Sequence, residues 1–114
     1  MYNFKDLTTY RRFIRGYFGR SYRWDELTMC INEFFECTGK EASENLLKEI
    51  HYIIELNDWE YIKKFNIEAE GIYYEEERNK EMMAKIIDVL SKNLRDKVSP
   101  ADIPSTYEDS KTGW

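Results

Sequence analysis

The stretch that decides the fold is residues 27–54, LTMCINEFFECTGKEASENLLKEIHYII. Its apolar side chains recur three and four positions apart, which is the period of one helical face. They are Leu27, Cys30, Ile31, Phe34 and Phe35 in the first half, then Leu46, Leu47, Ile50, Ile53 and Ile54. Between the two sets, Thr38 is followed three residues later by Glu41, the spacing of a capping box that opens a helix. The stretch therefore predicts two consecutive amphipathic helices that meet at 38–41.

The same helical spacing occurs on both sides of this stretch. It predicts a helix over about residues 6–18, which Gly19 is expected to end as a C′ residue with a positive φ. It also predicts a short helix over 59–65 and a last helix that starts near 75–77 and runs to about 94. The first of these two follows the pair Asn57–Asp58, which suits a helix cap.

Two segments lack the helical pattern. Residues 66–75, with Gly71 in them, are expected to form a short loop or strand-like element. Residues 99–114 contain two prolines and no periodicity, so we expect a flexible or loosely docked tail. The prediction for the whole chain is an all-α, single-domain bundle of four to five amphipathic helices over 1–98.

Length and composition set the class of protein. The chain has 114 residues, enough for one domain, and no stretch of about 20 apolar residues that could span a membrane. The first residues lack the apolar run of a signal peptide, so we expect a cytoplasmic protein. Cys30 and Cys37 are expected to be reduced, one in the core and one near a helix end.

The charge is divided unevenly along the chain, whose net charge is −5. Residues 1–24 hold six Lys and Arg against one acid, whereas residues 25–60 hold ten acids against two lysines. An acidic surface repels nucleic acid and attracts cationic partners.

No residue pattern in the chain indicates catalysis. The single histidine, His51, lies at the edge of an apolar stripe, where a boundary residue is the expected role. The sequence contains no CxxC, HExxH or G-x-S-x-G motif and no phosphate-binding glycine loop. We therefore predict no catalytic residue, no metal site, no cofactor and no enzymatic activity.

Acids interleaved with tyrosines suggest a protein interface. Glu68 and Glu70 precede Tyr73 and Tyr74, and tyrosine offers large contact area at low entropy cost while acids select a basic partner. The alternative is a solvated loop whose tyrosines fold back on the core. The run Glu75, Glu76 and Glu77 can likewise face a partner or simply match the positive end of a helix dipole.

The arginines near the N-terminus suggest a different function. Arg11, Arg12, Arg15, Arg20 and Arg23 could serve a nucleic-acid-binding regulator. Against this, the acidic remainder of the chain opposes a phosphate backbone, and ion pairs between the basic helix and the acidic helices would explain the asymmetry without a ligand.

Several short motifs, in this order, resemble those of a family of small bacterial proteins. The motifs are Gly16–Phe18, the pair Trp24 and Asp25, Leu46, Leu47, Glu49 and Ile50 in LLxEI, and Gly71, Tyr73 and Tyr74 before the last helix. Over about residues 4–94 this order is similar to immunity proteins of contact-dependent growth inhibition systems.

The resemblance implies a function without catalysis. Such proteins inhibit one cognate toxin domain by covering its active site or an essential surface. The toxins are commonly nucleases with basic substrate sites, so the expected partner is a basic toxin C-terminal domain, with neither membrane nor direct nucleic-acid binding. The candidate contact residues are Asp58, Glu60, Glu68, Glu70, Tyr73, Tyr74, Glu75, Glu76 and Glu77, with Glu33, Glu36 and Glu44 as second choices.

Overall fold

The computed structural model describes residues 7–19 and 22–103. These ranges contain the elements α1 (Thr8–Gly16), η2 (Trp24–Glu26), α2 (Leu27–Leu56), α3 (Trp59–Glu70), α4 (Glu76–Asp96) and η3 (Pro100–Asp102), where η denotes a 3-10 turn. The all-α prediction is confirmed, since no strand occurs among the described residues. Of residues 66–75, which were expected to form a loop or strand-like element, 66–70 belong to the end of α3 and 71–75 form a non-helical connection.

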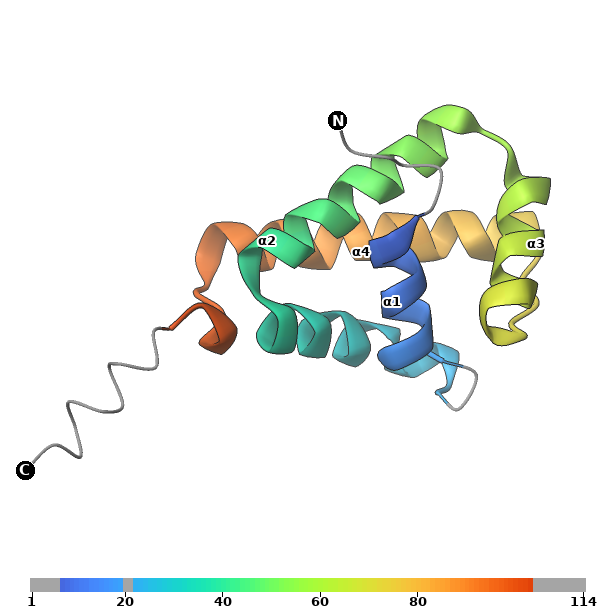
Figure 1. The fold of residues 1–114 in the computed structure, drawn as a ribbon. Helices are drawn as coiled ribbons and strands as arrows, with labels where there is room; N and C mark the ends of the chain where they lie inside the picture. The colour runs from blue at the N-terminus through green and yellow to red at the C-terminus, as the bar shows by residue number, and fades with distance from the viewer. Residues whose placement is uncertain (1–6, 20–21, 104–114) are drawn as a thin grey trace, which may run out of the picture.

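The helices pack around a bend in α2. Figure 1 shows two arms of α2 that diverge from an elbow near the C-terminal end of α4, with α1 across their opening and α3 at the far end. Helix α4 packs against α2 and also meets α3, and α1 contacts both α2 and α3. All four helices send apolar side chains into one core, which includes Phe13, Ile31, Ile50, Ile62 and Ile86.

The elbow of α2 lies at the predicted junction but forms in a different way. Gly39 has φ 92° and ψ −175°, a conformation essentially restricted to glycine, so the helix is interrupted there. The Thr38 hydroxyl donates to the Phe34 carbonyl at 2.5 Å, within the helix that ends. The predicted capping box with Thr38 as N-cap is therefore wrong, although the position of the break is right.

A segment far along the chain caps both sides of the elbow. The Ser99 hydroxyl lies 2.8 Å from the Phe35 carbonyl, at the end of the first arm. The backbone N–H of Lys40, at the start of the second arm, donates to Asp102 Oδ2 at 2.9 Å. Ser99 to Asp102, placed by the sequence at the start of the tail, thus dock on α2; residues 104–114 of that predicted tail lie outside the described residues.

Helix α1 is shorter than its apolar pattern and is capped by another helix. It ends at Gly16 with Tyr17 as the C-cap, and Gly19 has no positive φ, so the prediction that Gly19 ends this helix is wrong. At its start, the N–H groups of Thr9 and Tyr10 donate to the two carboxylate oxygens of Glu49, at 3.0 and 2.7 Å. Glu49, the acid of the LLxEI motif, is 0% exposed on α2. Burial raises the pKa of its carboxyl group, and the two amide donors oppose that rise.

The two cysteines lie where the sequence placed them. Both are free; Cys30 is buried in the core and Cys37 is exposed two residues before the elbow. Burial, helped by the nearby carboxylates of Glu33 and Glu26, raises the pKa of the Cys30 thiol to about 11. Over residues 7–19 and 22–103, no helix has the length and apolar character that crossing a membrane requires.

Candidate protein interface on α3

The nine first-choice contact residues belong to one continuous segment, which runs from the N-cap of α3 to the first turn of α4. Asp58 begins it as the N-cap, with a carboxylate that accepts the Tyr61 N–H at 3.1 Å. Beyond it, Trp59, Ile62 and Phe65 point inward, as their spacing predicts. This inward stripe leaves the opposite side of α3 in solvent.

The end of α3 turns the chain back along the helix. Gly71 has φ 69°, and its N–H donates to the Ile67 carbonyl at 2.8 Å. The bond from Gly71 is that of an αL helix end, and the N–H of Ile72 donates to the Asn66 carbonyl at 3.2 Å. As a result, Tyr73 lies beside α3, near Lys63.

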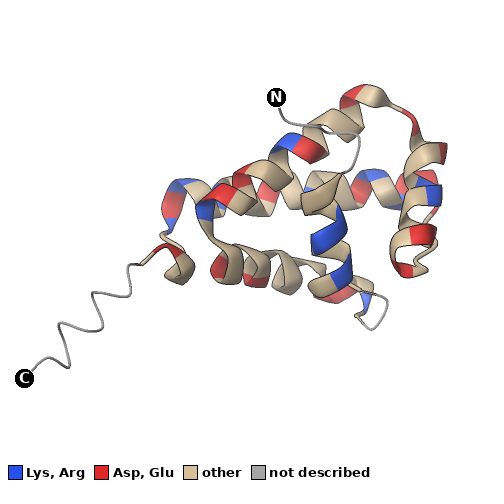
Figure 2. Cartoon of the chain, in the orientation of Figure 1, with Lys and Arg blue, Asp and Glu red and all other residues tan. Residues whose placement is uncertain are grey.

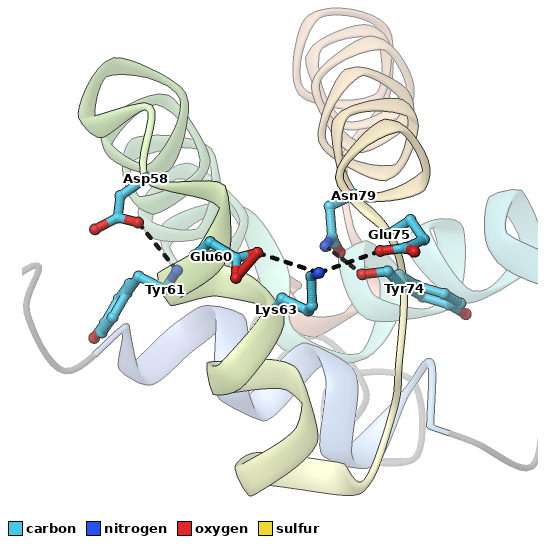
Figure 3. Close-up of polar contacts among 7 residues, drawn as sticks. All are labelled: Asp58, Glu60, Tyr61, Lys63, Tyr74, Glu75 and Asn79. Carbon is cyan, nitrogen blue, oxygen red and sulfur yellow. Dashed lines mark hydrogen bonds and ion pairs between the residues drawn. The ribbon is translucent and has the colours of Figure 1, made fainter.

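Lys63 holds the returning segment against α3 (Figure 3). Its Nζ lies 3.1 Å from Glu60 Oε2 on the same helix and 3.2 Å from Glu75 Oε1 at the N-cap of α4. The ammonium also lies 5.6 Å from the ring centre of Tyr73. These two hydrogen-bonded carboxylates raise the pKa of Lys63, and Lys63 is the main cause that lowers the pKa of Glu75.

Tyr74 faces the interior, in contrast to Tyr73. Its half-buried ring meets Trp24 edge-on with centroids 5.5 Å apart, and its carbonyl accepts from Asn79 Nδ2 at 3.1 Å. Asn79 Oδ1 in turn accepts from Asn66 Nδ2 at 2.9 Å, and Asn66 Oδ1 accepts from the Tyr10 hydroxyl at 2.6 Å. This buried chain of hydrogen bonds joins α1, α3 and α4. Tyr74 therefore helps to hold these helices together and is not a surface contact residue.

The outward side chains form a surface of mixed chemistry. Three of them are large and exposed: Tyr73 at 58%, Ile67 at 44% and Tyr61 at 38%. The same segment carries the carboxylates of Glu60, Glu68 and Glu75, and Glu68 makes no ion pair within the described residues. We call this surface the α3 face and define it as Glu60, Tyr61, Ile67, Glu68, Tyr73 and Glu75.

The remaining first-choice acids lie beside this face with other roles. Glu70 turns toward α1, where its Oε2 lies 3.8 Å from Arg15 Nε. Glu76 pairs with Lys80 one turn along α4 at 2.8 Å. Glu77 is exposed in the first turn of α4 and makes no ion pair within the described residues.

The second-choice acids lie away from the α3 face. Glu33 and Glu36 are exposed on the first arm of α2. Glu44 is on the second arm, where it lines a groove of about 740 Å³ beside the end of α4. Figure 2 shows acidic positions on both arms of α2, so the structure does not gather the acids of 25–60 into one patch.

The N-terminal arginines are partly engaged within the molecule. Arg11 lies over the Phe65 ring, with Cζ 4.7 Å from the ring centre, and Arg23 pairs with Asp25 at 3.0 Å. The expected ion pairs between the basic helix and the acidic helices of 25–56 are not found among the described residues. Arg15 meets Glu70 of α3 instead, and Arg12 is exposed without an ion pair in the described part of the chain. Arg20 lies outside the described residues.

The described residues beside this surface include neither His51 nor a group placed to hold a metal ion. His51 is exposed on the second arm of α2. Among the described residues, no group of three or more His, Cys, Asp or Glu side chains is placed to hold a metal ion.

Two contributors to the α3 face were not predicted as contact residues. Ile67 lies on the side of α3 opposite Trp59, Ile62 and Phe65, so the helical period of those apolar residues could have placed it outward. Tyr61 lies one turn before Phe65, with the two ring centres 6.3 Å apart, and the same period does not indicate its exposure. No signal in the sequence identified Lys63 as the group that joins Glu60 to Glu75.

Comparison with known proteins identifies no relative, because no protein-family model, no curated protein and no solved structure matches the chain.

Proposed function

We propose that this chain is an immunity protein of a contact-dependent growth inhibition system, which neutralises one toxin domain in the cytoplasm by stoichiometric binding. The observation that carries the proposal is the α3 face, where two tyrosines and an isoleucine are exposed among carboxylates. The order of motifs that resembles such immunity proteins supports the same function.

The α3 face has the composition of a binding surface. Tyrosine, which is enriched among residues that dominate binding energy, supplies contact area with few rotatable bonds. Tyr73 and Ile67 can lose much of their exposed surface to a partner, and Gly71 and the Lys63 contacts hold the segment that carries Tyr73 in place. A surface ordered before binding loses less entropy when it binds.

The charge of the face selects the partner. Glu60, Glu68 and Glu75 place carboxylates around the exposed apolar groups, and Lys63 and Lys64 are the two basic residues of α3 itself. A cationic partner is favoured, and a nuclease domain with a basic substrate site meets that requirement. Association of this kind accelerates at low salt, because salt screens exposed charges over about 10 Å at 0.1 M.

The direct test is inhibition of the toxin domain encoded next to this gene. The purified chain should stop that domain from cleaving RNA or DNA at a one-to-one ratio. Uninhibited cleavage at a tenfold excess of the chain would contradict the proposed function.

Variants on the α3 face test where the contact is made. Tyr73→Ala should weaken the complex by about 30-fold, the effect of losing a residue worth about 2 kcal/mol. Glu68→Lys should slow association and reduce its dependence on salt. Asp88→Lys, a matched change at an exposed acid of α4, should leave the association rate and its dependence on salt unchanged. If all three variants bind the toxin domain with equal affinity, the contact does not lie on the α3 face, although the chain can still be an inhibitor of that domain.

A further inference from the structure

A shallow hollow on α1 carries the positive charge of the described N-terminal region. It has a volume of about 390 Å³ and is lined by Thr8, Arg11, Arg12, Arg15 and Gly16. Gly16 leaves one end open, since a Cβ atom added there would meet nothing within 4 Å. The hollow lies at the lower end of the range of about 300–1,000 Å³ found for ligand pockets.

The guanidinium groups around the hollow keep hydrogen-bond donors for a ligand. Arg11 lies over the Phe65 ring, with Cζ 4.7 Å from the ring centre, and makes no ion pair among the described residues. Arg15 has one acidic neighbour, Glu70, at the long distance of 3.8 Å. Arg12 has no ion pair among the described residues.

We propose that this hollow, called the α1 hollow below, binds a carboxylate-bearing segment of a protein partner. Arginine binds carboxylates through paired N–H donors, and three guanidinium groups within one and a half helical turns can hold one or two carboxylates. Because the hollow is short, the segment that fits carries one or two acids among uncharged or basic residues. The inference is independent of the toxin proposal, which concerns the α3 face.

The surroundings favour a protein segment over a nucleic acid. A polynucleotide needs a positive track for successive phosphates. Here α1 contacts α2 and α3, which carry exposed acids such as Glu36 and Glu68, and the chain as a whole has a net charge of −5. Figure 2 shows the basic positions of α1 with acidic positions on the neighbouring helices.

The test is an NMR titration of the 114-residue chain with three probes. They are a blocked pentapeptide with two glutamates, the same peptide with glutamines, and a ten-nucleotide single-stranded RNA. We expect the glutamate peptide to shift the amide signals of residues 8–16 and to bind more tightly than the glutamine peptide and the RNA. Equal binding of the two peptides, or no shift in 8–16, would overturn the proposal, and tighter binding of RNA at these amides would assign the α1 hollow to nucleic acid instead.

Two variants separate charge from shape. Arg12→Gln should weaken binding of the glutamate peptide roughly three- to fivefold, the range for an exposed ion pair. Gly16→Leu should weaken it as well, because the new side chain fills the hollow while the arginines remain. Lys85→Gln, which removes an exposed positive charge from α4, is the matched control and should change nothing. Equal loss in Arg12→Gln and Lys85→Gln, with no loss in Gly16→Leu, would show that only net charge matters and would refute a built site.

Discussion

The elbow of α2 gives the sharpest test of how this fold is held. Gly39 has φ 92°, and a Cβ atom added there would lie 2.5 Å from Asp102 Oδ1. The substitution Gly39→Ala therefore has two costs. The backbone strain costs about 2 kcal/mol. Displacement of Asp102 from the Lys40 N–H removes a helix cap worth about 1 kcal/mol.

Gly39→Ala should thus lower the free energy of unfolding by about 3 kcal/mol, which a domain of typical stability survives in folded form. Urea unfolding followed by circular dichroism measures the loss. With an m-value of roughly 1–3 kcal/mol/M, the midpoint should fall by about 1 M or more. Gly16→Ala is the matched control: no atom lies within 4 Å of its Cβ position, and it should stabilise α1 by about 0.5 kcal/mol.

A double-mutant cycle separates the two costs of Gly39→Ala. Asp102→Ala should cost about 1 kcal/mol, because it removes only the cap. Combined with Gly39→Ala, it should add nothing further, so the double variant falls about 1 kcal/mol short of the sum of the single variants. Additive costs, or a loss below about 1 kcal/mol for Gly39→Ala, would refute the account of the elbow.

Three further predictions concern the contacts between helices. Tyr10→Phe leaves the Asn66 amide oxygen without its donor and should cost about 1–2 kcal/mol in urea unfolding; an unchanged midpoint would contradict this. Lys63→Met should raise the pKa of Glu75 toward its ordinary value in an NMR titration. Glu75 contributes stability above its unfolded pKa, and that stability is lost as pH falls through its lowered folded pKa. This contribution should shrink in the variant, where only the hydrogen bond from Tyr73 still lowers the pKa; a pKa of Glu75 that does not rise would contradict the role of Lys63. Glu49→Gln should speed hydrogen exchange at the two α1 amides that it caps more than in α4, whereas a uniform change would show that this carboxylate does not hold α1 locally.

The two proposed contact surfaces are neighbours with opposite charge. Phe65 of α3 lies under Arg11 of α1 and 6.3 Å from the Tyr61 ring, so the α1 hollow and the α3 face adjoin. A partner that engages both would need a basic region beside an acidic one. Such a pattern fixes orientation and disfavours wrong partners more than it adds affinity.

Residues of the candidate site were partly predictable because some of their roles are local. Asp58 caps α3 three residues ahead of the N–H that it accepts, and Gly71 ends the same helix. The difference between Tyr73 and Tyr74 could not be read from the sequence. It depends on Trp24, which reaches Tyr74 from a distant part of the chain and buries one ring of the pair.

The sequence by itself determined which segments are helical and which sides of them are apolar. Those properties depend on residues three or four positions apart, and the stripes of α2 and α4 follow that period into the core. The tertiary structure decided how the helix ends are satisfied and which acids stay free. Glu49 caps a helix about 40 residues away, and Asp102 caps the second arm of α2 from 62 residues away. A capping rule based on neighbouring residues does not find such partners, because the packing of α1 and η3 on α2 brings them within hydrogen-bonding distance.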